Sequence, residues 1–324
     1  MVVAQVPVVE LVDCRFPSDE GRREGIHVDI QLARSRQNTR TAMEPVRLRD
    51  GVATMPRVGV GTYRMGGEEL VRVVRAAIKA RPEGLLVDTA RAYRNESDVA
   101  DAVEGCTHAF VVTKVSPRAM GSYDDVRASV HGSLQDLRRT QLDLVLLHWP
   151  GASKLPPDSQ LHRTKRADAW RALEDMHREG LARAIGVSNF TERHLMELEK
   201  VWSIAPHVNQ VEMHPMLPQD ALLGVCSSFG IHTMAYSPLG TGALLQENSV
   251  VRVAERLNCT PGQVLVKWCL QKGASCVVKS ANADRMVSNL QAMNLRLDKC
   301  DMEELKKMGK ERTLKFCWDP ETIL

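Results

Sequence analysis

The chain has 324 residues, which is enough for one large domain or two of ordinary size. Hydrophobic residues make up 44% of it but aromatic residues only 4%, so a core must be built from aliphatic side chains, as in a barrel lined with branched residues. The formal net charge is only +3, which gives no reason to expect a nucleic-acid partner.

Eight cysteines are scattered along the chain, and none forms a C-x-x-C pair or a Cys/His cluster with metal-ligand spacing. Disulfide frameworks are typical of short secreted chains, so we expect reduced thiols with structural roles and no metal site. No apolar stretch approaches the ~20 residues that a membrane-spanning helix requires. These features predict a soluble, cytoplasmic protein without a membrane partner.

Residues 1–45 show no regular pattern. They open with an apolar run over residues 1–12 that lacks the basic region of a signal peptide. Acidic residues among the later arginines argue against a mitochondrial transit peptide. We interpret residues 1–45 as a disordered or loosely attached extension. The alternative is an upstream stretch wrongly included in the gene, with Met43 as the true start.

From Val46 onward the sequence becomes regular. Residues 46–53 alternate between apolar and polar on both sides of Asp50-Gly51, which is a strong hairpin signal. Eight short runs rich in Val, Ile, Leu or Ala follow, and each predicts a buried strand. The runs cover residues 58–62, 85–89, 110–114, 144–148, 184–188, 208–213, 233–237 and 276–279.

Helical patterns separate these strands. Residues 68–79 and 165–179 carry apolar side chains at helical spacing, whereas residues 151–165 are typical of a polar loop. Thr260 and Gln263 form a capping box that marks another helix start. Strand–helix alternation repeated eight times predicts an α/β fold, a (β/α)8 TIM barrel over residues 46–324 with an N-terminal β-hairpin. An open doubly wound sheet is the alternative.

Active sites of such barrels lie at the carboxyl ends of the strands, so the residues that close each run matter most. Polar or charged residues close nearly every run. Any one of them has an ordinary explanation: a histidine is often structural, a lysine solvated and an Asp-Thr pair a helix cap. Their convergence on one rim is not expected of a packed core.

Four side chains at this rim suit acid catalysis. They are Asp88, Tyr93, Lys114 and His148. Free tyrosine has a pKa of about 10, and we expect the Lys114 ammonium, held by Asp88, to lower that pKa in Tyr93. His148 can donate a hydrogen bond to a substrate carbonyl, so the set can protonate an oxygen as it gains negative charge. It contains no activated nucleophile.

Several motifs follow one another along the chain. They are Gly59-Val60-Gly61-Thr62-Tyr63, Asp88-Thr89-Ala90, Leu147-His148-Trp149-Pro150, Ile185-Gly186-Val187-Ser188-Asn189, Asn209-Gln210-Val211-Glu212, Ala235-Tyr236-Ser237-Pro238-Leu239-Gly240 and Lys279-Ser280. In their order and spacing, from about Val46 to the C-terminus, the sequence resembles the aldo-keto reductases.

The resemblance implies a role for each matching position. The catalytic set is Asp88, Tyr93, Lys114 and His148. The residues that bind NADPH or NADP+ are Thr62, Ser188, Asn189, Gln210, Tyr236, Ser237, Leu239, Gly240, Lys279, Ser280, Arg285 and Asn289. The residues that contact substrate are Tyr63, Tyr93, His148 and Trp149. Within the family's steroid double-bond reductases a glutamate replaces the histidine, so His148 favours carbonyl reduction.

The cofactor assignment also has a physical reason. A 2′-phosphate brings roughly two negative charges, which Arg and Lys pair with well. A Rossmann NAD site would show G-x-G-x-x-G after a strand, but here Arg64 stands at the third glycine position. Val278 and Ser288 depart from the family pattern, which predicts one weakened cofactor contact. Arg91 is either a surface residue or favours acidic substrates.

The resemblance therefore implies an NADPH-dependent reductase of aldehydes and ketones in which Tyr93 supplies the proton. We expect a monomer with broad specificity for small to medium carbonyls, because the tail after Arg312 is short and leaves an open pocket that Trp318 can line. The alternative is a regulatory or structural protein that keeps the barrel and the cofactor site, as potassium-channel β-subunits and some lens crystallins do.

Overall fold

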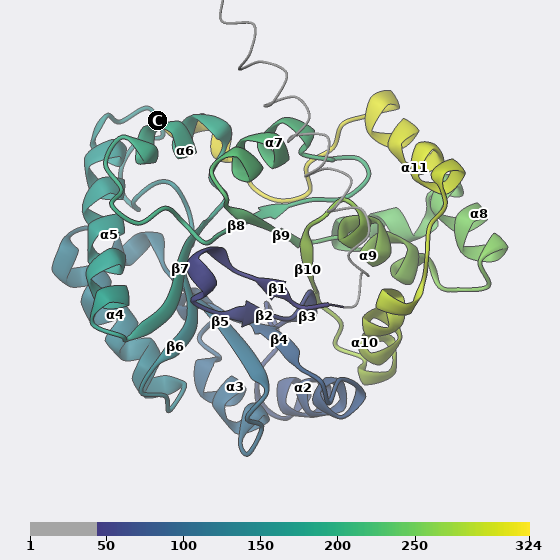
Figure 1. Cartoon of the computed structure of the whole chain (residues 1–324), viewed down its shortest axis with the longest axis horizontal. Coiled ribbons are helices and arrows are strands. Elements are labelled where there is room, and N and C mark those ends of the chain that lie inside the picture. Colours follow the sequence, from purple (N-terminus) through teal and green to yellow (C-terminus); the bar gives the residue numbers. More distant parts are fainter. Residues whose placement is uncertain (1–43) are drawn as a thin grey trace, which may run out of the picture. The chain divides into compact units, whose positions relative to one another are not determined.

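The computed structural model describes residues 44–324, and its central feature is a closed barrel of eight parallel strands (Figure 1). The strands are β3 (Val58–Gly61), β4 (Leu85–Asp88), β5 (Ala109–Val115), β6 (Leu142–Leu147), β7 (Ala182–Ser188), β8 (Val208–Glu212), β9 (His232–Tyr236) and β10 (Ser275–Val278). They pair in chain order, and β10 closes the ring against β3. The predicted barrel is confirmed, and the open sheet is wrong.

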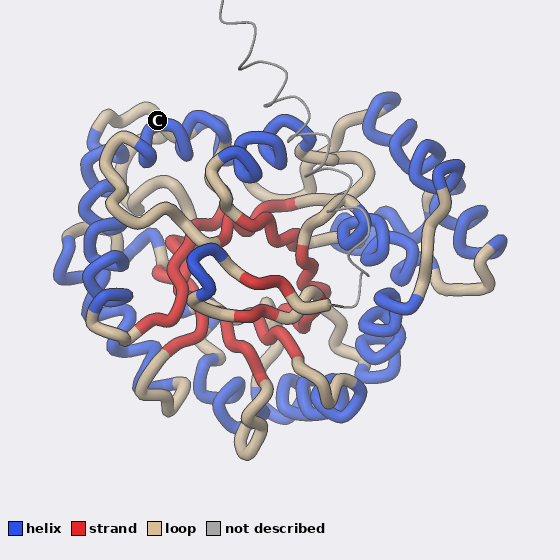
Figure 2. The backbone as a smooth tube through the Cα atoms, viewed as in Figure 1, coloured by secondary structure: helices blue, strands red, loops and turns tan. Residues whose placement is uncertain are grey.

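Helices surround the strands (Figure 2). They are α2 (Gly67–Ala80), α3 (Glu96–Val103), α4 (Tyr123–Asp136), α5 (Leu161–Arg178), α6 (Glu192–Glu199), α7 (Asp220–Ser228), α8 (Asn248–Arg256), α9 (Pro261–Gln271), α10 (Ala283–Leu290) and α11 (Lys299–Glu311). The capping box of α9 is confirmed, with Gln263 N 3.2 Å from Thr260 Oγ1. Helix α5 begins at Leu161, inside the segment predicted as a loop. The sequence pattern did not indicate this first turn, because the turn buries polar His162 instead of an apolar side chain.

The N-terminal hairpin covers one opening of the barrel (Figure 1). Strands β1 (Val46–Arg47) and β2 (Thr54–Met55) are shorter than the alternation suggests, because the chain makes a 3-10 turn at Arg49–Gly51. Asp50 has φ 57° and Gly51 φ 69°, the left-handed region that Asp-Gly pairs tolerate. The apolar side chains of the hairpin pack with those that fill the barrel interior.

Two apolar layers hold the fold together. One fills the barrel beneath the hairpin, and the other lies between the strands and the helices. Gly59 shows how tightly the strands pack: a Cβ there would lie 2.1 Å from the carbonyl oxygen of Leu86 on β4. The Gly59-Val60-Gly61 sequence therefore serves the contact between β3 and β4, as expected for a barrel strand rather than a phosphate loop.

The predicted extension over residues 1–45 lies almost wholly outside the described part of the chain. Within residues 44–324, no helix combines the length and the apolar character needed to cross a membrane. The seven cysteines in the same part of the chain are free thiols.

Candidate active site

The four predicted catalytic residues converge on the rim formed by the carboxyl ends of β4, β5 and β6. Asp88 is the last residue of β4, Lys114 lies near the end of β5, and His148 directly follows β6. Tyr93 ends the short 3-10 turn Arg91–Tyr93 that follows β4. Parallel strands of a barrel bring their carboxyl ends to one face, so residues far apart in sequence meet there.

A buried ion pair forms the base of this cluster. Lys114 Nζ lies 2.8 Å from both carboxylate oxygens of Asp88 and 2.8 Å from the carbonyl oxygen of Thr89. The Lys114 side chain is 0% exposed and that of Asp88 only 6%. All three ammonium protons therefore have an acceptor, which fixes the position of the charge. Burial lowers the pKa of Lys114, and the neighbouring Asp88 opposes that shift.

The Tyr93 ring lies over this ion pair, with Lys114 Nζ 5.1 Å from the ring centroid. Burial, and then the negative charge of Asp88, raise the pKa of Tyr93 well above its usual range. The expected net lowering of this pKa is therefore wrong, because burial and the charge of Asp88 outweigh the Lys114 ammonium. Asp88 offsets the field of the ammonium, and the poorly hydrated phenolate is disfavoured. The phenol stays protonated at neutral pH, as a proton donor must.

His148 faces Tyr93 edge-on, with ring centroids 5.6 Å apart. Burial and the charge of Lys114 lower the pKa of His148 to about 3, so the imidazole is neutral at physiological pH. Its Nδ1 atom is buried without a hydrogen-bond partner in residues 44–324. A neutral imidazole beside a phenol can bind a carbonyl oxygen without adding positive charge.

A buried amide holds the loop that carries Tyr63. Asn95 Nδ2 donates to the carbonyl oxygens of Thr62 and Met65, and its Oδ1 accepts from the Thr89 hydroxyl. Tyr63 itself is 52% exposed, and its ring centroid lies 5.0 Å from that of Tyr93. Asn95 therefore places a second aromatic ring beside the phenol.

Arg91 is paired with two carboxylates. Its guanidinium pairs with buried Glu96 at 2.9 Å and also with Asp136 on α4. Glu96 accepts a further hydrogen bond from the Thr113 hydroxyl at 2.6 Å. Because two carboxylates already neutralise Arg91, the hypothesis that it favours acidic substrates has no support in its contacts.

The predicted nicotinamide residues form a connected row along the ends of β7, β8 and β9. Gln210 Nε2 donates to Asp88 Oδ1 at 2.7 Å, so this row is joined to the catalytic cluster. Tyr236 donates to Asn189 Oδ1 at 2.7 Å, and the Ser188 hydroxyl donates to the Gln210 carbonyl oxygen at 2.8 Å. Asn189 has φ 64°, a left-handed turn that aims its amide inward.

The remaining predicted cofactor residues lie from β9 to α10. Thr62 is buried, and its hydroxyl donates to the Asp88 carbonyl oxygen. Ser237, Leu239 and Gly240 follow β9 in a turn with two left-handed residues, since Ser237 has φ 49° and Gly240 φ 55°. Leu239 and Asn289 meet over Gly262, where a Cβ would lie 2.5 Å from Asn289 Oδ1.

Of the three residues predicted to contact the 2′-phosphate, Lys279, Ser280 and Arg285, only Arg285 lines a hollow. Arg285 lines an open hollow at the start of α10, whereas Lys279 does not line it. The Ser280 hydroxyl is engaged with Asn282 in the turn before α10. Arg72 of α2 lines the same hollow as Arg285 and was not foreseen from the sequence. Among the described residues, neither guanidinium has a hydrogen-bond or ion-pair partner.

The comparisons with known proteins agree with this geometry. A sequence model described as the aldo/keto reductase family matches residues 57–310. The chain belongs to the aldo/keto reductase family. It is 37% identical over 273 residues to a glyoxal reductase of Bacillus subtilis, which covers 83% of this chain and 94% of that one. It is 34% identical over 268 residues to a 9,11-endoperoxide prostaglandin H2 reductase of Trypanosoma cruzi (80% of this chain, 90% of that one).

Solved structures give the same assignment. A crystal structure of a mutant of the Gox0644 protein in complex with NADPH matches with a TM-score of 0.78 at 32% identity, over 87% of this chain and 99% of that one. An aldo/keto reductase from Brucella melitensis matches with a TM-score of 0.74 at 30% identity (82% and 98%). The resemblance stated from the motifs is confirmed.

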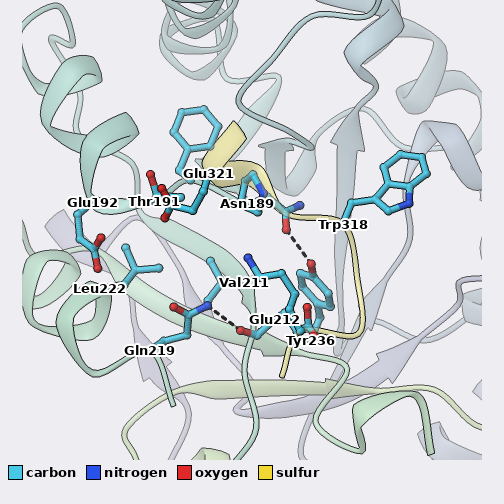
Figure 3. Close-up of a pocket in the computed structure, with 13 residues that line it drawn as sticks. Asn189, Thr191, Glu192, Val211, Glu212, Gln219, Leu222, Tyr236, Trp318 and Glu321 are labelled. Carbon is cyan, nitrogen blue, oxygen red and sulfur yellow. Dashed lines mark hydrogen bonds between the residues drawn. The ribbon is translucent and has the colours of Figure 1, made fainter. Parts of the chain in front are cut away.

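The C-terminal tail of this aldo/keto reductase completes the rim. Trp318 is 84% exposed and meets the predicted substrate residue Trp149 edge-to-face, with centroids 6.3 Å apart. A hollow beside the tail is lined by Asn189, Tyr236 and Trp318, among others (Figure 3). Glu212, the last residue of β8, also lines it, and sequence reasoning gave this acid no role although it closes a strand.

Proposed function

We propose that this aldo/keto reductase is an NADPH-dependent reductase of aldehydes and ketones, with Tyr93 as the proton donor. The observation that carries the proposal is the buried Lys114–Asp88 pair beneath a protonated phenol, with a neutral imidazole alongside. This arrangement has a donor for a developing alkoxide and a fixed positive charge below that donor.

The residues present fit NADPH. Arg72 and Arg285 share a hollow, and the Lys279 ammonium nearby in sequence has no ion-pair partner among the described residues, as expected of cations that await a phosphate. We assign Ser188, Asn189 and Gln210 to the carboxamide and Tyr236 to the face of the nicotinamide ring. When bound, the cofactor supplies a hydride to the carbonyl carbon.

The protein's own residues then manage the charge on the carbonyl oxygen. His148 donates a hydrogen bond to that oxygen and orients it toward Tyr93. Tyr93 transfers its proton to the oxygen as negative charge develops there. Lys114 stabilises the resulting phenolate, and Asp88 keeps the lysine charged and in place. Gln210 also donates to Asp88 Oδ1 and helps to hold that carboxylate in place.

We propose small and medium aldehydes and dicarbonyls as substrates. The open setting of Tyr63 and Trp318 supports this, and the name of the Bacillus subtilis relative points to the same chemistry. The test is NADPH consumption with glyoxal, methylglyoxal and benzaldehyde, followed by identification of the alcohol product. Tight NADPH binding without turnover on any carbonyl would instead favour a regulatory protein. The expectation of a cytoplasmic monomer remains a prediction.

A further inference from the structure

Strand β8 ends in a buried carboxylate that binds the C-terminal tail. We propose that Glu212 is a positioning residue for substrate: it holds residues 312–324 across the barrel mouth and so fixes Trp318 as a wall of the pocket. This inference rests on the proposed carbonyl reduction. It adds a residue, more than 100 positions from the tail in sequence, that controls the substrate side of the site without contacting the reacting atoms.

Glu212 binds the tail through both of its carboxylate oxygens. The Phe316 amide donates to Oε1 at 2.7 Å, and the Cys317 amide donates to Oε2 at 3.1 Å. His214 Nε2 lies 3.1 Å from Oε1 as well. Glu212 is only 2% exposed, so these contacts replace its water. Burial acts to raise the pKa of Glu212, but hydrogen bonds from His214 and the Phe316 amide outweigh it and lower the pKa, which keeps the carboxylate ionised.

Side-chain packing reinforces the same anchor. The Phe316 ring meets His214 with centroids 5.2 Å apart. A Cβ at Gly240 would lie 2.7 Å from a ring atom of Phe316, so the glycine makes room for that ring. Cys317 Sγ lies 3.6 Å from the Ser237 hydroxyl. The anchored part of the tail therefore lies against Ser237 and Gly240, in the segment assigned to NADPH binding.

The far end of the tail has an anchor of its own on α6. The Arg193 guanidinium donates to the Ile323 carbonyl oxygen, and His194 Nε2 lies 2.8 Å from the same oxygen. Trp318 lies between the two anchors and makes no hydrogen bond with its indole among the described residues. The backbone on both sides of this exposed indole is therefore held, at Glu212 on one side and at α6 on the other. Release at Glu212 would free the side of the tail nearest to the pocket.

The neighbouring acids do not share this role. Glu192 and Glu321 also line the hollow, and in the described part of the chain their carboxylates have no hydrogen-bond or ion-pair partner (Figure 3). Glu192 stands on α6 rather than on the tail. Glu192→Gln removes the same charge from the same hollow and leaves both tail amides bound, so it is a matched control for Glu212→Gln.

The first experiment is limited trypsin digestion of the full chain, with cleavage after Lys315 followed by mass spectrometry. A glutamine has an NH2 group in place of one carboxylate oxygen, so it can accept a hydrogen bond from only one of the two tail amides. Glu212→Gln should therefore speed cleavage after Lys315 by about tenfold, given the strength of hydrogen bonds to charged groups. Glu192→Gln should leave the rate at the wild-type value. This readout needs no turnover, so it fails or succeeds independently of the proposed function. An unchanged rate in Glu212→Gln would overturn the proposal.

The second experiment separates positioning from general damage. For benzaldehyde, Glu212→Gln should raise KM about tenfold and change kcat less than about twofold, because the substrate ring loses its edge-to-face contact with Trp318. For methylglyoxal, which offers no ring to Trp318, KM should stay near wild type. Trp318→Ala should reproduce this pattern, and adding Glu212→Gln to it should have no further effect on KM. Equal KM increases for both substrates, or additive effects, would contradict the proposal.

A third measurement needs no variant, which matters if Glu212→Gln does not fold. Amide hydrogen exchange of the wild-type protein should show slow exchange at Phe316 and Cys317 and fast exchange at Trp318, which has no amide acceptor among the described residues. Equally fast exchange at all three amides would show that Glu212 does not hold the tail.

Discussion

The proposed catalytic cluster around Lys114 and the hollow at the start of α10 both contain positive charge, but the charge is held in opposite ways. At the catalytic cluster, Lys114 is fully buried and every ammonium proton has an acceptor. At the hollow beside α10, Arg72 and Arg285 are exposed and have no partner in residues 44–324. A charge that tunes a proton donor must be fixed in advance, whereas a charge that recruits a phosphate must be free.

Removing the buried charge should give the largest effect. Lys114→Met should lower kcat for carbonyl reduction about a thousandfold, in the range typical of lost acid–base assistance. It also leaves the buried Asp88 carboxylate unpaired, which should cost about 3–5 kcal/mol of unfolding free energy. Steady-state kinetics and urea unfolding measure the two effects.

Lys272→Met is the control, since it breaks a surface ion pair with Asp220. That variant should lose no more than about 1 kcal/mol of unfolding free energy and keep its activity. A similar loss of unfolding free energy and activity in Lys114→Met and Lys272→Met would contradict the distinction between buried and exposed cations.

Removing the exposed cations should affect binding alone. Arg285→Ala and Arg72→Ala should each weaken NADPH binding about tenfold and NADH binding less than twofold, because only NADPH carries the 2′-phosphate. The wild-type preference for NADPH over NADH should be about a hundredfold or more. Fluorescence titration of both cofactors with the wild type and the two variants measures all six affinities.

Arg75→Ala, on α2 like Arg72, is the control, because the Arg75 guanidinium already donates to the Asp101 carbonyl oxygen. It should leave both affinities unchanged. Equal losses of NADPH and NADH affinity in Arg285→Ala would mean that Arg285 supports the loop rather than the phosphate.

Burial of His148 should appear as a modest pH effect on stability. Its pKa is about 3 in the fold and 6.5 when exposed, so between these values the unfolded chain binds more protons and stability falls as pH is lowered. The loss should reach about 1 kcal/mol per pH unit below 6.5 for this residue. His148→Asn should flatten the slope by that amount in urea unfolding at pH 7 and pH 5. If His148→Asn leaves the pH dependence of the unfolding free energy unchanged, His148 is exposed to solvent in the folded protein.

The smallest effect is expected outside both regions. Deleting residues 1–42 should leave the thermal midpoint and kcat/KM within error of the full chain, because the barrel begins at the hairpin. Calorimetry and steady-state assays test this. A large drop in the midpoint would show that the extension packs onto the barrel.

Local patterns were enough to predict much of this molecule. The eight strands follow from short branched runs, and the capping box of α9 from two side chains three residues apart. The proposed catalytic residues could be predicted as a group because each lies near or soon after the carboxyl end of a strand, and a barrel brings strand ends together. The role of Gly59 in a barrel strand was also predicted, because Arg64 stands where a dinucleotide-binding motif would have its third glycine.

Features that depend on distant partners could not be predicted. Glu212 binds backbone amides of the tail, which carry no side-chain signal. Arg72 lies on a helix whose other face supplies the periodic pattern. The raised pKa of Tyr93 follows from burial and from the nearby negative charge of Asp88, and sequence order does not reveal how these two effects combine. The first turn of α5 was missed because a buried His162 breaks the apolar stripe.

The central claim is that Tyr93 delivers the proton, and Tyr93→Phe tests it most directly. The variant keeps the ring above Lys114 and removes only the hydroxyl. Its rate of methylglyoxal reduction at saturating NADPH should fall at least about a thousandfold, while NADPH affinity by fluorescence titration stays within about twofold of wild type. Substantial carbonyl reduction by Tyr93→Phe would contradict the account and move the acid to another group.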